Sequence, residues 1–161
     1  MLHSYNEDED DNSIQISDVT VWQTTIAHLA AMDGLDSIIT HLRHKFEQGR
    51  QSASPGDTIH TRAKAGGLDN LDCFGRTPLS WAAGGGNVAT LELMLDVGPK
   101  LESQDGRGRT SLHHAANSGH MSIVKRLVRA RCYGEPRDFN GDTPLHLAAI
   151  YEHWDVLEYL L

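Results

Sequence analysis

The sequence is poor in cysteine and has no long hydrophobic run. Two cysteines in 161 residues, Cys73 and Cys132, are too few for a disulfide framework, so we expect free thiols in a reducing compartment. The first twenty residues contain no lysine, no arginine and no apolar stretch, which argues against a secretory signal. No segment suggests a membrane span. We therefore expect a cytoplasmic or nuclear protein without a membrane partner.

Catalytic motifs are missing as well. The sequence has no GxSxG or HExxH, and no placed pair of cysteine and histidine. The glycine run at residues 84–86 follows a predicted helix and lacks the Lys-Ser/Thr ending of a phosphate-binding loop. His41 and His44 have i, i+3 spacing, but the sequence places no further metal ligand beside them. The sequence thus predicts no enzyme, no metal site and no cofactor.

Positive charge is scarce at one end of the chain. The net charge is −8, and the first twenty residues hold six acidic and no basic residues. The rest of the chain is close to neutral, so it lacks the basic footprint of a protein that binds nucleic acid directly. We expect residues 1–18 to form a disordered acidic tail, because this composition cannot repay the entropy of ordering.

What the sequence does have is a repeat. The stretches GRTPLSWAA, GRTSLHHAA and GDTPLHLAA begin at Gly75, Gly108 and Gly141, at a constant spacing of 33 residues. A fixed period of this length is typical of a stacked repeat architecture. In each unit a glycine turn precedes a threonine that can cap a helix, and an alanine pair follows on that helix.

A second helix completes each unit. In HMSIVKRLVRA the apolar residues Ile123, Val124 and Leu127 are spaced to lie on one helical face. One helical hairpin cannot bury such a stripe alone, so neighbouring units must cover it. Proline at the first helical position, as in Thr143-Pro144, suits the start of the first helix.

This pattern resembles the ankyrin repeat, whose Thr-Pro-Leu-His and Ala-Ala signature is nearly complete at Thr143 to Ala149. The resemblance covers Asp72 to Leu161, and it implies an all-α solenoid of stacked helix-turn-helix units with short turn fingers. It implies a non-catalytic module that binds another protein on its concave face. GRTPLSWAAGGGN also resembles ankyrin units of filamentous fungi, where small ankyrin proteins are often regulators or transcription co-regulators.

A degraded fourth copy lies upstream, at Thr25 to Leu42. Its Thr25 precedes Thr77 by 52 residues, which implies an insertion of 19 residues in a Ser- and Gly-rich connector. The predicted organisation is a tail (1–18), a degenerate repeat (20–45), an inserted loop (46–71) and three repeats (72–104, 105–137 and 138–161), the last ending within its second helix.

The repeat also accounts for several of the ten histidines. His28, His113 and His146 occupy one register position, three residues after the capping threonine, where the imidazole can bond the threonine hydroxyl. His120 and His153 share a second position, at the start of the second helix. We therefore interpret these side chains as structural.

The resemblance also places a binding face on the finger tips and on the solvent side of the first helices. Aromatic residues and arginines are common anchors of interfaces, and this face holds several. The predicted partner-binding residues are Trp22, Met32, Asp33, Phe74, Arg76, Arg107, Arg109, Asn117, Ser118, Phe139, Asp142, Ile150 and Tyr151.

Two other interpretations stay open. The chain is a small enzyme if His114, Asp33 or Arg109 converge in a closed pocket on the concave face. It is a fragment of a longer array if its last helix, which carries Trp154 and Leu161, has an uncovered apolar side. The same exposed C-terminal helix allows self-association.

The register makes one prediction about stability. Replacing Thr143 by alanine removes a helix cap and should lower the free energy of unfolding by about 1 kcal/mol. Thermal melting of the wild type and of Thr143→Ala measures this difference. An unchanged melting curve would count against the proposed register.

Overall fold

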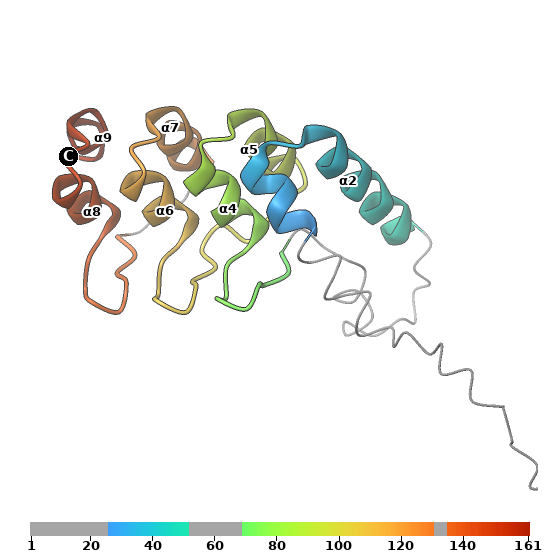
Figure 1. The fold of residues 1–161 in the computed structure, drawn as a ribbon, viewed down its shortest axis with the longest axis horizontal. Helices are drawn as coiled ribbons and strands as arrows, with labels where there is room; N and C mark the ends of the chain where they lie inside the picture. The colour runs from blue at the N-terminus through green and yellow to red at the C-terminus, as the bar shows by residue number, and fades with distance from the viewer. Residues whose placement is uncertain (1–25, 52–68, 131–134) are drawn as a thin grey trace, which may run out of the picture.

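The computed structural model describes residues 26–51, 69–130 and 135–161 (Figure 1). Within these ranges every regular element is a helix, as the sequence predicted. The predicted acidic tail, Trp22, Cys132 and most of the predicted insertion lie outside the described residues.

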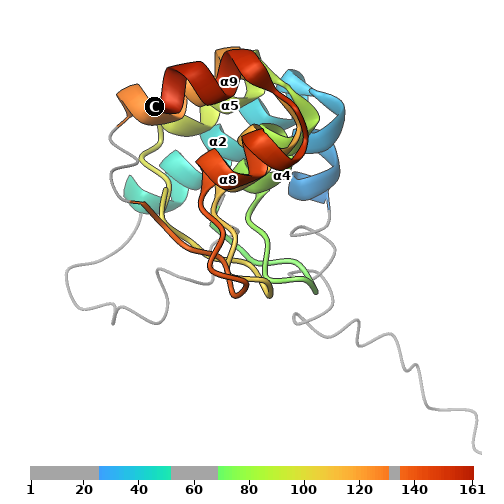
Figure 2. The same cartoon turned by 90° about the vertical axis from the view of Figure 1, so that its left-hand side faces the viewer.

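The helices form hairpins that stack side by side in two layers (Figures 1 and 2). One layer holds the helix at residues 26–33 and the first helices of the following repeats; the other holds the second helices. The first helices are α4 (Pro78–Gly85), α6 (Ser111–Asn117) and α8 (Pro144–Ile150), and the second helices are α2 (Asp36–Gln51), α5 (Val88–Leu95), α7 (Met121–Arg129) and α9 (Trp154–Leu160).

The caps that the sequence predicted begin the first helices. The Thr77 side chain accepts a hydrogen bond from the backbone N–H of Ser80, and Pro78 follows at the first helical position. The Thr143 hydroxyl lies 2.7 Å from Nδ1 of His146 and also accepts from the His146 N–H, which completes a capping box. Thr110 and His113 make the same box in the middle repeat.

The core lies between successive hairpins. The alanine pairs of the second and third copies are fully buried, because only small side chains let the first helices approach closely. Ile123, Val124 and Leu127 of α7 are buried on the same side, as their spacing predicted. In the last copy Ala148 is buried but Ala149 is exposed, since no described helix packs beyond α8.

Histidines join each repeat to the next. Nε2 of His113 hydrogen-bonds to the backbone carbonyl of Asp142 at 3.1 Å, and Nε2 of His28 bonds that of Arg76 at 2.8 Å. His120 and His153, from the second shared position, bond to the carbonyls of Gly84 and Asn117. Each bond crosses from one hairpin to its neighbour.

The second repeat departs from this scheme, because Ser80 stands at the histidine position. Its hydroxyl lies 3.2 Å from the hydroxyl of Ser111 in the next repeat. Ser111 itself replaces the proline found at Pro78 and Pro144. Two unusual residues in neighbouring repeats thus satisfy each other in a buried position.

The degenerate first copy stacks on the second as a hairpin of the same kind. The Asn87 side chain donates to the Ala31 carbonyl at 2.9 Å, and Thr90 donates to the Asp36 carboxylate. One boundary differs from the sequence analysis: α2 continues to Gln51, so residues 46–51 are helical and the loop does not begin at residue 46.

The second helix of the last copy presents both a covered and an exposed side. Val156 is fully buried, and Leu157 and Leu160 are half-buried against the core. Trp154 and Leu161 are 65% and 89% exposed. These exposed side chains are those expected for the open end of the array.

Two glycines make a matched test of the packing between loops. Gly108 and Gly141 both have a positive φ, 77° and 86°, which an alanine adopts at a cost of about 1 kcal/mol. A Cβ on Gly108 would also meet the Phe139 ring at 2.7 Å, whereas one on Gly141 would meet nothing within 4 Å.

We therefore expect Gly108→Ala to lower the free energy of unfolding by roughly 2 kcal/mol or more, and Gly141→Ala by about half as much. Denaturant titration of both variants measures the difference. Equal losses would show that the contact between Phe139 and the backbone of Gly108 adds nothing.

Candidate partner-binding face

Three loops that precede the first helices form projections on one side of the array, which we call the fingers (residues 69–77, 102–110 and 135–143; Figure 1). Each finger is closed by an aspartate at the same register position. In the middle finger, Oδ1 of Asp105 accepts from the backbone N–H of Arg107 at 2.8 Å and of Arg109 at 2.9 Å. Asp72 and Asp138 accept equivalent pairs of bonds, so all three fingers share one tight turn.

The second carboxylate oxygen has a different partner in each finger. Oδ2 of Asp72 accepts from the Trp81 indole at 2.8 Å, and that of Asp105 lies 2.9 Å from Nε2 of His114. Oδ2 of Asp138 accepts from Nε of Arg109 at 3.1 Å, which ties the last finger to the one before it. These bonds fix the fingers to the first helices and to one another.

Backbone hydrogen bonds also join the fingers. The N–H of Gly106 donates to the Phe74 carbonyl at 2.8 Å, and the N–H of Phe139 donates to the Arg107 carbonyl at 2.9 Å. Neighbouring finger tips are therefore held side by side, and the surface they present is preorganised.

Burial and hydrogen bonding shift the pKa values in this framework. Burial acts to raise the pKa of Asp105, but hydrogen bonds from the Arg109 and Arg107 amides and from His114 outweigh it and lower the pKa. Burial lowers the pKa of His114, although the Asp105 carboxylate opposes the shift. Burial also lowers the pKa of His113.

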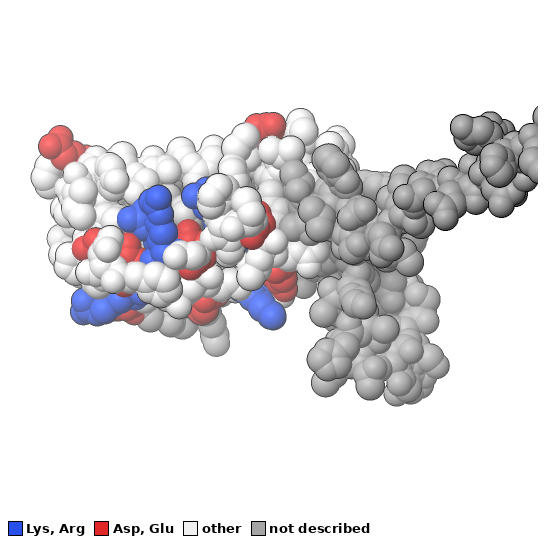
Figure 3. Space-filling view, turned by 60° about the horizontal axis from the view of Figure 1, so that its bottom comes forward, with Lys and Arg blue, Asp and Glu red and all other residues white. Residues whose placement is uncertain are grey.

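Large apolar side chains are exposed on this face despite the ordered framework. Phe74 and Phe139 at the finger tips are 60% and 77% exposed, and Ile150 and Tyr151 at the end of α8 are 59% and 51% exposed. Arg107 is exposed beside them. Seen from the finger side, lysine and arginine atoms lie among acidic ones and form no continuous basic surface (Figure 3).

Two of the predicted contact arginines have partners inside the array. The guanidinium of Arg76 lies 5.2 Å from the ring centres of both Phe74 and Trp81, where cation–π attraction holds it. The Arg109 side chain is only 15% exposed and pairs with Asp138. Both arginines stabilise the fingers, which leaves Arg107 as the exposed arginine of the three.

The other predicted contact residues fall into three groups. Trp22 lies outside the described residues. Met32 and Asp33 are exposed at the end of the helix at residues 26–33, as are Phe74, Arg107, Phe139, Ile150 and Tyr151 at their own positions. Asn117, Ser118 and Asp142 are half-buried.

The sequence analysis missed the aspartates that close the fingers and the exposed Arg137 on the last finger. The signal for the aspartates was available, because Asp72, Asp105 and Asp138 recur with the period of 33 residues. Arg137 has no counterpart at the same register position, so the repeat gives no signal for it.

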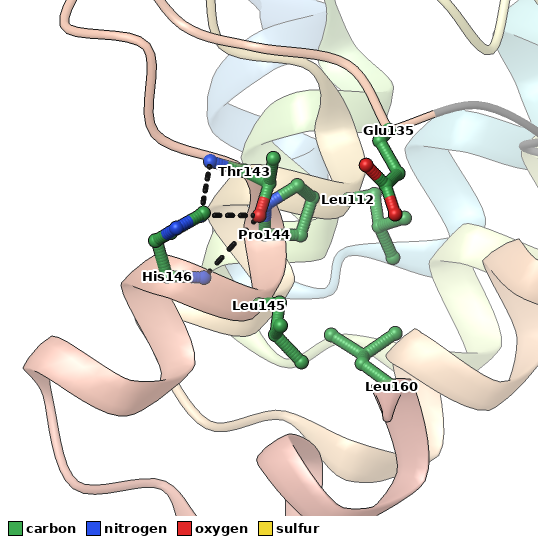
Figure 4. A pocket seen from close by; sticks show the side chains of 7 residues that line it. All are labelled: Leu112, Glu135, Thr143, Pro144, Leu145, His146 and Leu160. Carbon is green, nitrogen blue, oxygen red and sulfur yellow. Dashed lines mark hydrogen bonds between the residues drawn. The ribbon is translucent and has the colours of Figure 1, made fainter.

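The residues considered for catalysis do not share a pocket. A cavity of about 220 Å³ lies at the last repeat, with a largely apolar lining of Leu112, Glu135, Thr143, Pro144, Leu145, His146 and Leu160 (Figure 4). Asp33, Arg109 and His114 are absent from this lining, and the last two are bonded to separate aspartates. His146 in the cavity is engaged with Thr143.

Metal-binding groups do not gather in the described ranges. Among those residues, no cluster of three or more His, Cys, Asp and Glu side chains could hold a metal ion. Cys73 is a free, exposed thiol. None of the described helices is both long enough and apolar enough to cross a membrane.

Comparison with known proteins agrees with the stacked hairpins. A family model for ankyrin repeats (3 copies) matches residues 2–128 and 90–161, which together span nearly the whole chain. No curated protein matches the sequence.

The buried histidines make stability depend on pH. The unfolded chain binds protons more readily than the folded one at His113 and His114, because their pKa values are lowered in the fold. The free energy of unfolding should therefore fall as the pH drops through and below the unfolded histidine value of about 6.5. Denaturant titrations at about pH 7.5 and about pH 5.5 measure this loss.

His114→Leu is the matched variant, since Leu147 occupies the same position in the last repeat. It should reduce the loss between the two pH values, whatever its effect on stability at neutral pH. A loss identical to that of the wild type would show that His114 does not cause the pH dependence.

Proposed function

The chain belongs to the ankyrin-repeat family, and from this we propose that it binds a partner protein through its fingers and the exposed side of its first helices. Ankyrin repeats are in general modules of protein–protein interaction. The family fold by itself does not say which surface binds, so the proposal rests on the residues of the face described above.

One observation carries the proposal: exposed aromatic and apolar side chains stand on a hydrogen-bonded framework. Phe74 and Phe139 are more than half exposed, yet the backbones of their fingers are fixed to the neighbouring finger. Such side chains bury a large apolar area in a complex and lose little conformational freedom. Ile150 and Tyr151 extend the same kind of surface to the end of α8.

The charges of this face suggest where a partner gains specificity. Asp72, Asp105 and Asp138 are engaged by backbone amides and by Trp81, His114 and Arg109, so they are not available to a partner in that form. Arg107 is exposed between the two phenylalanine-bearing fingers. An arginine beside exposed aromatics suits a partner segment with an acidic group flanked by apolar residues.

The finer role that we propose is that of a regulatory adaptor or transcription co-regulator that acts through its partner. Support comes from the likeness of GRTPLSWAAGGGN to ankyrin units of filamentous fungi, among which such roles are frequent. The near-neutral, mixed charge of the finger side agrees with recognition of a protein rather than of nucleic acid.

A comparison of two triple variants tests the proposal. The first, Phe74→Ala, Arg107→Ala and Tyr151→Ala, removes exposed side chains of the face. The control, Trp154→Ala, Arg129→Ala and Tyr159→Ala, removes two aromatics and one arginine from α7 and α9. Circular dichroism first establishes that both variants keep the helical content of the wild type.

Affinity capture from the source cells identifies a partner of the wild type, and titration calorimetry then measures binding of that partner to all three proteins. We expect the face variant to bind at least about tenfold more weakly and the control to bind as the wild type does. Equal affinity of the face variant and the wild type would refute this surface as the binding site.

A further inference from the structure

The first hairpin has an apolar side that no described part of the chain covers. We call this side the first-repeat face; it is formed by Ile26, Leu29, Leu35, Ile38 and Leu42. The first four are 46%, 48%, 46% and 37% exposed, and Leu42 is half-buried. In Figure 1 this hairpin, the helix at residues 26–33 with α2, ends the row of described helices.

The register of the repeats shows what normally covers this side. Ile38 corresponds to Thr90, Ile123 and Val156, and all three of these are fully buried. Ile26 corresponds to Pro78, Ser111 and Pro144, which are buried too. In the later copies the preceding hairpin packs on these positions, so a helical hairpin is the shape that fits the first-repeat face.

The composition of the face is unusual for an end of the array. Terminal repeats normally turn a polar side to solvent because nothing stacks beyond them. Here Leu29 stands where later repeats have Trp81 and His114, and Leu35 stands where they have Asn87 and His120. A contiguous apolar surface of this kind marks a contact with another molecule.

Two charges frame the face and identify its occupant. By helical geometry Asp33 lies on the same side as Ile26 and Leu29, next to the turn between the two helices. Lys45 lies on the stripe of Ile38 and Leu42, at the far end of α2. Both side chains are exposed. The face therefore has an acid at one end and a cation at the other.

We propose that the first-repeat face is the contact between two copies of this chain, related by a two-fold axis that crosses the helices. Such an axis sets each helix antiparallel to its mate, so Asp33 of one copy meets the end of the other that carries Lys45. An axis along the helices would instead bring the two Asp33 side chains together. This contact goes beyond the proposed function, because it uses a different surface.

The opposite end of the array is a poorer contact for a second copy. The exposed apolar residues of α9 lie beside Asp155 and Glu158, and Glu152 precedes the helix. The helix carries no basic residue to oppose these acids. Two copies joined through α9 would place like charges together, which disfavours association.

The size of the face sets the strength of the dimer. Two helices side by side, about 10 Å wide each and about 20 Å long, offer on the order of 400 Å² per copy. This is below the area of standard stable complexes, so we expect a weak dimer with a dissociation constant on the order of 10 µM. Both copies keep their fingers free for a partner.

Sedimentation equilibrium of the full chain, at concentrations that bracket this constant, tests the proposal. The wild type should dimerise, and Ile38→Asp should remain monomeric, because a charge would be buried in the contact. Ile150→Asp is the matched control, with an exposed isoleucine elsewhere on the array, and should dimerise as the wild type does.

A charge exchange tests the geometry without removing apolar surface. Asp33→Lys and Lys45→Asp should each weaken the dimer by about tenfold, and the chain with both changes should recover most of the loss. Because both positions are exposed, these variants should fold even if Ile38→Asp does not. Recovery in the double variant supports the two-fold contact.

Three results would overturn the proposal. A wild type that is monomeric at all concentrations would leave the face to a foreign partner. A dimer that survives Ile38→Asp but is lost in Leu161→Asp would place the contact at α9. A dimer weakened by both single charge changes and not restored by the double change would exclude this arrangement.

Discussion

The packing of each helical hairpin on the one before it holds this chain together, because no hairpin can bury its own apolar stripe. Buried alanine pairs let the first helices approach closely, and histidines at two register positions bond to carbonyls of the neighbouring repeat. The fingers depend on this packing as well, since Asp72 and Asp105 are anchored to side chains of the first helices. The binding face is thus a product of the stack rather than of any single repeat.

The repeat made most of the fold predictable from the sequence. Thr77, Thr110 and Thr143 mark the start of three first helices, and the apolar spacing in α7 marks its buried side. These features are local and recur, so the period reveals them. The end of α2 was not predictable, because residues 46–51 belong to a connector without a counterpart in the other repeats.

The candidate site was predictable in position but not in the role of each residue. The register placed Phe74, Phe139 and Tyr151 on the exposed face, where the structure has them. It could not show that Arg76 stacks on Phe74 and Trp81, or that Arg109 pairs with Asp138. Those roles depend on distances between neighbouring repeats, which sequence spacing does not give.

The pair of hydroxyls at Ser80 and Ser111 fixes the order of the repeats. Each serine departs from the usual residue at its position, and each satisfies the other across one repeat boundary. If the second copy were joined directly to the fourth, Ser80 would face Pro144, which has no hydroxyl to offer. The copies therefore cannot be exchanged like identical bricks, and deletion or shuffling of repeats would strand a buried polar group at the new junction.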